Sequence, residues 1–580
     1  MEYNKFFSVI DDHVSHYEEG TITISEDIEF SMRKTVRTIT HYILSRYMNG
    51  VDNKDPNTGQ RRPFRNIGNA IVDLEWRAKN IDRKSIEGHA TDGDHIFTLL
   101  VNKELQLWMK NNNFGKTIDD YQRKKSEYGS ALLKKTETSD ELLIEPVKWE
   151  HTVVDPRDIS GGPKIEKNYL TVLDLKKKKD VWEGDQIDLA IEQARKSKGK
   201  NKDNRIEVLD IEGEFEKCDL YETEQDAEED DTIGLYNVIV ANVDQKKFVL
   251  YKTELTESRY KHDKRKEVEG CDFGMGVWQE VFEPQIWTNE AVIGEKEAMD
   301  IGGKVVITTN KKDVPSGMTI MNGEIIELEA DEYFKPVSLS PQTFPEYQNQ
   351  IDNWFANMQR DQSAYPGITG EEPKASTPAA SLQLQAAQGA SIFNKRRDQD
   401  GYFLMEIVVE WVLPFVVKKI NKEHKLTASY SPGELKLLDE AIKNFHDFHG
   451  SKEAILSDKL VTPDMQQGFR ALVDQMHQPH GDSRTLTIPK SFITLDRIKQ
   501  KVRFDITDEM KDDQRELNGL ATALGAMAPT DPGRAAIIEQ MLEITGNSAA
   551  SFPVASAPST PAPVTTPGRT NAVLPAAQQA

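Results

Sequence analysis

The chain has 580 residues and a formal net charge of −23, with 37% hydrophobic and 29% charged residues. It is long enough to bury several cores, so we expect more than one domain. The charge argues against a protein that holds DNA through a broad basic footprint. No window is long and apolar enough to span a bilayer, and even the run 408–417 is interrupted by Glu410 and Pro414.

The number of cysteines and the N-terminal residues indicate the cellular compartment in which the chain folds. The two cysteines, Cys218 and Cys271, favour free thiols in a reducing cytosol, although one disulfide between them is also compatible with the sequence. The N-terminal residues lack the basic and apolar regions of a secretory signal. We therefore expect the chain to fold in the cytosol.

Helices are predicted first along the chain, and strands follow them. Apolar residues at three- and four-residue steps predict helices over 28–48, 66–80 and 97–110, with a polar loop over 52–64. Alternating apolar residues predict antiparallel strands within 129–154 and 206–255.

A further helix is predicted over 181–194, between basic runs at 176–179 and 196–202. These runs could contact nucleic acid, but they are more typical of a solvated face, and the acidic run 222–231 is typical of a solvated loop.

The stretch 277–420 has the most informative order of elements. A helix over 277–300, in which Pro284 marks either a kink or the true start, leads into a β-rich segment with strands at 304–308 and 324–328. A helix over 344–365, a Pro-, Gly-, Ser- and Thr-rich loop over 366–381 and a long helix over 382–420, bent at Pro414, follow. On pattern alone this order is typical of a helical domain with a β-hairpin insertion.

The remaining C-terminal part is predicted to be mostly helical. Helices are expected over 431–448, 463–476 and 507–527, with a strand at 502–506. From residue 549 onward the Pro-, Ala-, Ser- and Thr-rich composition predicts disorder.

Few residues in the chain suggest chemistry. The stretch from Gly367 to Ser376 lacks the spacing of a phosphate-binding loop, and two glutamates lie where phosphates would be held. The pairs His446/His449 and His477/His480 lack a metal-binding helix pattern, and Asp92 or Asp94 is better explained as a helix cap. We therefore expect no catalytic centre, no metal and no cofactor.

Several local patterns together resemble a known family. They are the segments 155–159 and 162–169, and the Gly-rich entry at 270–285 into a helix that carries Gln285 and Asn289. With the order of elements in 277–420, these patterns resemble the portal proteins of tailed double-stranded DNA phages, over roughly residues 140–545. The resemblance implies an α+β, ring-forming subunit.

The resemblance also implies a division of the chain. Its parts would be an N-terminal wing (1–276), stem helix 1 (277–300), a small α/β clip (301–340), stem helix 2 (341–365), a tunnel loop (366–381), a long wing helix (382–425), a mostly helical wing and crown (426–548) and a disordered tail (549–580).

The site residues follow from that division. The stem residues would be Gln285, Asn289, Lys296, Tyr347 and Trp354. The clip would dock partners through Lys311, Lys312, Asp313 and Asn322. The tunnel loop would face DNA with Gly367, Thr369, Gly370, Glu371, Glu372, Lys374 and Ser376.

The function implied is a ring of about twelve copies at one capsid vertex of the virion, assembled in the host cytoplasm. DNA would pass through it during packaging and ejection, contacting it transiently and without sequence specificity. Its partners would be the terminase large subunit, the major capsid protein and scaffold, and the head–tail adaptor, with no membrane. The net charge fits a channel wall that DNA does not stick to, although ordinary solubility explains it equally well. The alternatives are a packaging nuclease or ATPase, or another structural protein of the virion.

Overall fold

The computed structural model describes most of residues 4–505 and a few positions beyond them. The described ranges are 4–48, 53–54, 59, 61–91, 95–138, 141–196, 205–220, 232–244, 246–302, 306–310, 331, 334–337, 344–362, 379–420, 424–430, 432–456, 462–477, 483–488, 493–505, 520–522, 524, 537–538 and 541. Two compact units divide the chain: Met1–Leu426 with Thr487–Asp508, and Thr427–Leu486 with Glu509–Ala580. The described helices include none that is both long and apolar enough to cross a membrane.

The described part mixes helices with antiparallel sheets, which confirms the α+β class. The first elements are α1 (Asn4–Glu19), β1 (Ile22–Ser25), β2 (Ile28–Phe30), α2 (Met32–Ile43), α3 (Gly68–Ala78), β3 (Glu87–Ala90), α4 (His95–Asn111) and α5 (Phe114–Tyr128). The predictions for α3 and α4 are confirmed to within two residues at each end, whereas α1 and α5 were not predicted.

The helix predicted over 28–48 is wrong at both ends. Residues 28–30 pair with β1, and Ser31 Oγ then accepts a backbone N–H of the first turn of α2 at 3.3 Å, which caps its start. At the other end, Asn66 donates its side-chain amide to the Tyr42 carbonyl at 2.9 Å, satisfying one of the free carbonyls of the last turn.

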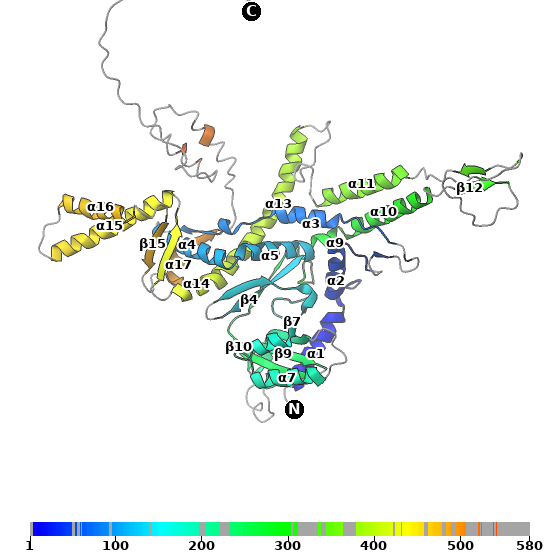
Figure 1. Cartoon of the computed structure of the whole chain (residues 1–580), viewed down its shortest axis with the longest axis horizontal. Helices are drawn as coiled ribbons and strands as arrows, with labels where there is room; N and C mark the ends of the chain where they lie inside the picture. The colour runs from blue at the N-terminus through cyan, green and yellow to red at the C-terminus, as the bar shows by residue number, and fades with distance from the viewer. Residues whose placement is uncertain are drawn as a thin grey trace, which may run out of the picture. The chain divides into compact units, whose positions relative to one another are not determined.

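The N-terminal part contains a five-stranded antiparallel sheet, in the order β10-β9-β8-β7-β6. Its strands are β6 (Thr152–Val154), β7 (Lys164–Thr171), β8 (Arg205–Glu216), β9 (Ile233–Val243) and β10 (Lys246–Leu255). Successive side chains face opposite sides of the sheet, so Leu209 joins the core that contains Phe6 of α1. Its neighbour Val208 joins the core that contains Ile187 of α7 (Gly184–Lys196) (Figure 1). The strands predicted within 206–255 and the helix predicted over 181–194 are therefore confirmed.

A three-stranded sheet, β11-β4-β5, forms the second sheet of this unit. It consists of β4 (Ser130–Glu137), β5 (Leu142–Pro146) and β11 (Tyr260–Lys264). Gly129 precedes β4 with φ +84°, and a Cβ there would lie 2.3 Å from the Gly276 nitrogen. Only glycine fits this close backbone approach, which fixes the sheet against the entry to the next helix.

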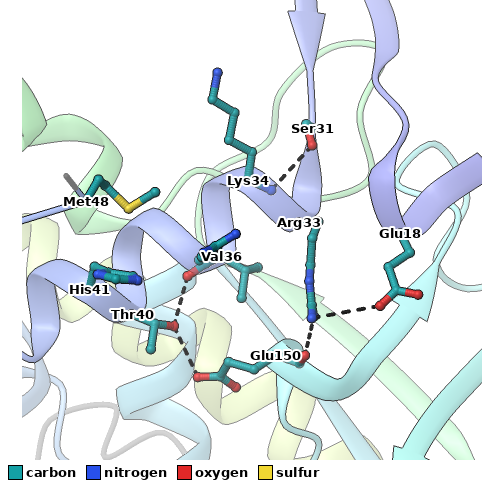
Figure 2. A pocket seen from close by; sticks show the side chains of 10 residues that line it. Glu18, Ser31, Arg33, Lys34, Val36, Thr40, His41, Met48 and Glu150 are labelled. Carbon is teal, nitrogen blue, oxygen red and sulfur yellow. Dashed lines mark hydrogen bonds and ion pairs between the residues drawn. The ribbon is translucent and has the colours of Figure 1, made fainter. Parts of the chain in front are cut away.

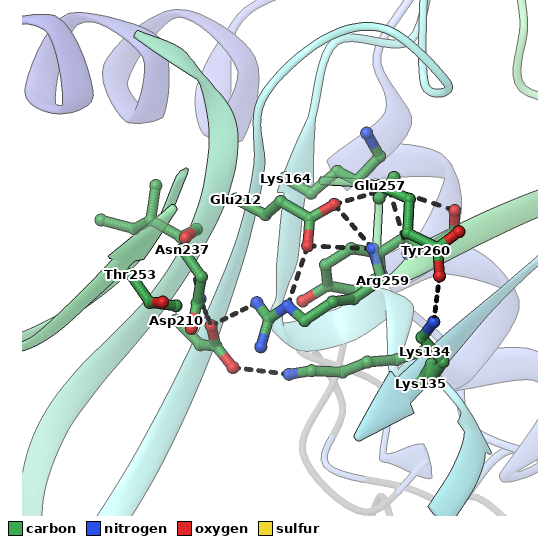
Figure 3. A network of polar contacts seen from close by, with 12 residues as sticks. Lys134, Lys135, Lys164, Asp210, Glu212, Asn237, Thr253, Glu257, Arg259 and Tyr260 are labelled. Carbon is green, nitrogen blue, oxygen red and sulfur yellow. Dashed lines mark hydrogen bonds and ion pairs between the residues drawn. The ribbon is translucent and has the colours of Figure 1, made fainter. Parts of the chain in front are cut away.

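Charged side chains join the two sheets (Figure 3). Asp210 of β8 accepts hydrogen bonds from Lys134 Nζ at 2.7 Å and from an Arg259 Nη at 2.9 Å, and Glu212, which is fully buried, accepts from Arg259 Nε at 2.9 Å. Burial alone would raise the pKa of Asp210, but Lys134 and Arg259 lower it to about 2. The joint between the sheets is therefore ionic.

A helical hairpin with a β tip follows (Figure 1). It consists of α9 (Val277–Glu280), α10 (Phe282–Gly302), β12 (Val306–Thr309), β13 (Phe334–Val337) and α11 (Phe344–Asp361). Pro284 lies in the first turn of α10, so of its two predicted roles it marks the true start. The strand predicted at 304–308 is confirmed as β12, but its partner is β13, and the strand predicted at 324–328 lies outside the described residues.

The long helix predicted over 382–420 is observed as α13 (Ala379–Ile407), a π-helical turn (Val408–Val412) and α14 (Leu413–Ile420). The Leu413 N–H donates to the Val408 carbonyl, five residues back. Pro414 has no N–H for the carbonyl four residues before it, so the ladder widens at this point. Pro414 thus coincides with the irregularity that the sequence predicts.

The second unit contains α15 (Pro432–Leu456), α16 (Pro463–His477) and most of the strand pair β14 (His424–Ser429) and β15 (Ser483–Ile488). Its two predicted helices are confirmed, and α15 extends eight residues beyond its predicted end. In the first unit α17 (Leu495–Lys501) leads into β16 (Val502–Asp505), the predicted strand, which pairs with β3. Most of the helix predicted over 507–527, the tail from 549 and the cap at Asp92 or Asp94 lie outside the described residues.

Candidate functional site at the base of the helical hairpin

The predicted stem residues lie on the antiparallel helices α10 and α11. Trp354 of α11 stacks on Trp287 of α10, with ring centroids 6.3 Å apart and an interplanar angle of 12°. Tyr347 packs against Gly294, where a Cβ would lie 3.0 Å from its ring. Lys296 forms an ion pair with Asp300 one turn later, at 2.7 Å. The contacts of Trp354 and Tyr347 hold the two helices side by side, and Trp287 is 53% exposed.

Gln285 lies at the base of the hairpin and caps a different helix. The residue before α3 offers no side-chain cap to its free N–H groups. Gln285 Oε1 accepts the Ile67 and Gly68 N–H groups at 2.9 and 3.0 Å, and Gln285 Nε2 donates to the Arg65 carbonyl at 2.6 Å. Asn289 Oδ1, one turn along, accepts the Arg65 N–H at 3.0 Å. The sequence singled out both amides, and the structure shows that they attach α10 to the body.

A buried ionic cluster lies beside this attachment. Its members come from five elements, α3, α5, β11, α9 and α13, and from the residues that directly follow α3 and β11. Four are carboxylates and four are cations: Glu75, Asp263, Glu280, Asp400, Lys79, Lys125, Arg265 and Arg396. The charges balance, as they must for charged groups removed from water.

Glu75 is the first centre of the ionic cluster and is 2% exposed. Its carboxylate lies 3.1 Å from Lys79 Nζ, 3.0 Å from Arg265 Nε and 2.6 Å from an Arg396 Nη. Burial alone would raise the pKa of Glu75, but the three cations hold it well below its usual range. The carboxylate is therefore charged at any physiological pH.

Asp400 is the second centre and has no exposed surface. Its carboxylate lies 2.6 Å from Lys125 Nζ and 3.6 Å from Lys79 Nζ, and it accepts a hydrogen bond from Gln122 at 3.3 Å. Lys125 also binds Asp263, and despite burial these two carboxylates raise the pKa of Lys125. Asp400 thus fixes the register of α13 against α5.

The cluster contacts the chain on both sides of residues 363–378. Gln362 is the last described residue before them, and its side-chain oxygen accepts from Arg265 at 3.3 Å. Arg396 and Asp400 lie in the helix that follows. The predicted tunnel-loop residues Gly367, Thr369, Gly370, Glu371, Glu372, Lys374 and Ser376 lie outside the described residues, as do the clip residues Lys311, Lys312, Asp313 and Asn322.

Sequence reasoning missed this cluster because its members come from distant segments. One signal was available within α5, where Phe114, Ile118, Tyr121 and Tyr128 recur at helical spacing, with Lys125 at the position that completes the stripe. All five are buried. A lysine within an apolar stripe indicates a buried cation that needs a carboxylate partner.

Ser130, His262 and Asp272 are arranged in space like the catalytic triad of a hydrolase. His262 Nε2 lies 3.1 Å from Ser130 Oγ, and His262 Nδ1 lies 3.6 Å from Asp272. However, Ser130 has no exposed surface, and its hydroxyl accepts the Gly274 N–H at 2.8 Å. The hydrogen bond from His262 lowers the pKa of Asp272 well below its usual range. The arrangement ties β4 and β11 to the Gly-rich entry and offers no hydroxyl to a substrate.

Within the described residues, one group of side chains has donor atoms close enough together to hold a metal ion: Glu216, Cys218 and Asp219. Lys5 Nζ lies 2.7 Å from Asp219 and compensates its charge. Burial and the neighbouring Glu216 raise the pKa of the Cys218 thiol, which disfavours the thiolate that a metal needs. This donor set fits a metal poorly. Cys271, the other cysteine, is a buried free thiol.

We expect Gln285→Ala to lower the free energy of unfolding by about 2–3 kcal/mol, because two buried N–H groups and one carbonyl would lose their partner. Urea unfolding followed by circular dichroism would measure the change. Gln350→Ala is the matched control, since Gln350 is exposed on α11 and should cost under about 0.5 kcal/mol. Equal costs for the two variants would show that α3 does not depend on this cap.

No protein-family model matches the sequence, and a search among curated proteins finds no match. Among solved structures the chain is similar to a chain of one described as "Virion of native gene transfer agent (GTA) particle", with a TM-score of 0.32 and 10% sequence identity, over 74% of this chain and 100% of that chain. A TM-score this low does not establish a shared fold.

Proposed function

We propose that this protein is a portal subunit, one of about twelve copies in a ring through which double-stranded DNA passes. The observation that carries the proposal is the order of elements after the sheets: α10, the strand pair β12–β13, α11 and then the long helix that begins with α13. This is the order of stem, clip, stem and long wing helix that the sequence resemblance implies.

The contacts at the base of the hairpin support a mechanical role. The α10–α11 hairpin is attached through Gln285 and Asn289, and its far end carries the strand pair β12–β13. The ionic cluster then holds α13 against α3 and α5 through Arg396 and Asp400. A subunit that guides a moving polymer needs its projecting parts anchored in a rigid body, and buried ion pairs with fixed geometry supply such anchors.

In this proposal the clip docks the terminase and later the head–tail adaptor, and the tunnel loop (366–381) contacts DNA. Phosphate contacts of a single lysine per copy, Lys374, carry no sequence information and would stay transient beside Glu371 and Glu372. The ring would lie at a capsid vertex of the virion, against the major capsid protein, and it would perform no chemistry of its own.

The mass of the purified particle tests the proposal. We expect a particle of about 790 kDa, twelve times the chain mass of 65.7 kDa, in mass photometry or multi-angle light scattering. Trp287→Glu should shift the population toward monomers, because the large exposed Trp287 ring is suited to an interface between copies. Leu189→Glu, on α7 and 48% exposed, is the matched control and should leave the ring intact.

Other outcomes would contradict the proposal in different ways. A monomer with nuclease or ATPase activity would favour a packaging enzyme. A different closed or open assembly without a central channel in negative-stain images would favour another structural protein of the virion. A ring unaffected by Trp287→Glu would leave the portal proposal standing but remove Trp287 from the interface.

A further inference from the structure

A basic pocket lies at the C-terminal end of α2. This pocket of about 660 Å³ is lined by four cations, Arg46, Arg61, Arg62 and Lys296, and no carboxylate is among its described lining residues. Arg46 and Arg61 are exposed. Lys296 of α10 pairs with Asp300, so Arg46 and Arg61 supply most of the positive charge that a ligand would meet.

The described walls of this pocket are held by specific hydrogen bonds. Asn53 Oδ1 accepts the Tyr47 N–H at 3.0 Å, and Asn53 Nδ2 donates to the Ser45 carbonyl at 2.8 Å. The Tyr47 hydroxyl donates to the Pro63 carbonyl at 2.7 Å. Ser45 and Asn53 both have positive φ, 56° and 58°. These hydrogen bonds hold the described residues around Ser45, Asn53 and Pro63, and Arg46 and Arg61 line the same cavity.

A second pocket, which runs along α2, shows the contrast (Figure 2). There Arg33 donates to the Glu150 carbonyl and lies 3.9 Å from Glu18, so two carboxylates line the same cavity as the cations. Although burial opposes it, hydrogen bonds lower the pKa of Glu150, which keeps its negative charge. That pocket is largely compensated, whereas the described lining of the Arg46 pocket includes no carboxylate.

The surrounding sequence strengthens the local charge. Between Arg46 and Arg65 the chain has five Lys or Arg residues and two Asp residues, in a protein whose net charge is −23. At physiological salt a charge is screened over about 8 Å, so the distant carboxylates do not cancel the field of this segment. The nearby field is therefore positive on an acidic protein.

We propose that the Arg46 pocket binds the phosphate backbone of double-stranded DNA. Arginine guanidinium groups bind phosphate oxygens through paired N–H donors, and several cations in one cavity match a ligand with closely spaced negative charges. Contacts with phosphate oxygens carry no sequence information, so binding should be independent of sequence. The residues of this site are distinct in sequence from those of the tunnel loop, and the proposal does not depend on ring formation.

The test is fluorescence polarisation of a fluorescein-labelled duplex of about 24 base pairs with the full-length protein, between about 50 and 200 mM NaCl. The double variant Arg46→Gln/Arg61→Gln should bind about tenfold more weakly at the lowest salt. The slope of log affinity against log salt should fall by about two, one for each arginine that no longer neutralises a phosphate. Two duplexes of unrelated sequence should give the same affinities.

The matched control is Arg195→Gln/Lys196→Gln at the exposed end of α7, which removes the same charge elsewhere. It should leave affinity and slope unchanged. Equal weakening by both double variants, or no binding by the wild type at about 50 mM NaCl, overturns the proposal.

A synthetic peptide of residues 220–232, which contains the acidic run, tests the other anionic partner, a second copy of the chain. If the peptide binds through Arg46 and Arg61 and the duplex does not, the assignment to DNA is wrong. The particle mass is measured in parallel. A ring that does not bind the duplex through Arg46 and Arg61 would contradict this inference alone, and binding without a ring would contradict the portal proposal alone.

Discussion

Replacement of Asp400 by alanine is expected to lower the free energy of unfolding by about 3–5 kcal/mol, because it leaves Lys79 and Lys125 buried without one of their carboxylates. Both lysines are at most 1% exposed, so water cannot replace the missing partner. Chemical unfolding monitored by tryptophan fluorescence would measure the loss. Because α13 would also lose its register against α5, assembly of the proposed ring should fail at temperatures where the wild-type protein assembles.

Two further variants make this prediction specific. Asp398→Ala, two residues earlier on α13 and partly exposed, should cost under about 1 kcal/mol. The double variant Lys125→Met/Asp400→Leu should recover part of the stability lost in Asp400→Ala, since removing a buried pair together costs less than removing one partner. If Asp400→Ala and Asp398→Ala behave alike, the ionic cluster does not hold α13.

The second large effect is expected at the joint between the sheets. Arg259→Met removes the cation that contacts both Asp210 and Glu212 (Figure 3), so at pH 7 it should cost about 3–5 kcal/mol. The two sheets are expected to loosen together, because Lys134 alone remains to pair with Asp210. Thermal unfolding of the wild type and the variant across a pH series would measure the cost.

The pH dependence of that cost has a definite sign. The pKa of Asp210 is about 2 in the folded protein, below its value of about 3.9 in an unfolded chain. Its contribution is therefore present above about pH 4 and is lost as the pH falls toward 2, which lowers wild-type stability by about 2 kcal/mol. In Arg259→Met the folded pKa is higher, so less is lost and the difference between the two proteins narrows.

Arg157→Met is a suitable control for the sheet joint, because Arg157 is an exposed arginine outside the network. It should cost little and show the acid profile of the wild type. A difference between Arg259→Met and wild type that stays constant from about pH 7 to about pH 2.5 would show that Asp210 does not depend on Arg259 for its low pKa.

Local patterns in the sequence were sufficient for most regular elements. Val208 and Leu209 lie on opposite faces of β8, and this alternation can be recognised from neighbouring residues alone. The helical spacing of apolar residues in α3 and α4 is likewise a local pattern. Pro414 imposes its effect on the residues directly before it, which is why an irregular turn could be expected there. The order of hairpin helices and long helix, on which the proposed function rests, also follows from these local patterns.

Long-range contacts decided the rest. Helix α2 begins later than predicted because residues 28–30 pair with β1, and β12 pairs with β13, a strand that was not predicted. Pairing of strands depends on which partners meet in space, and local propensity does not specify that. Helix α5 was not predicted because a buried lysine, Lys125, interrupts its stripe of apolar residues.

The ionic cluster illustrates the same division most clearly. Glu75 and Arg396 are separated by 321 positions, and no local pattern links a glutamate in one helix to an arginine in another. The sequence by itself determined that α3 and α13 are helices and that both carry charged residues. Only the tertiary structure decided that these charges face one another, because the cost of burying each is offset only where packing brings an opposite charge within about 4 Å.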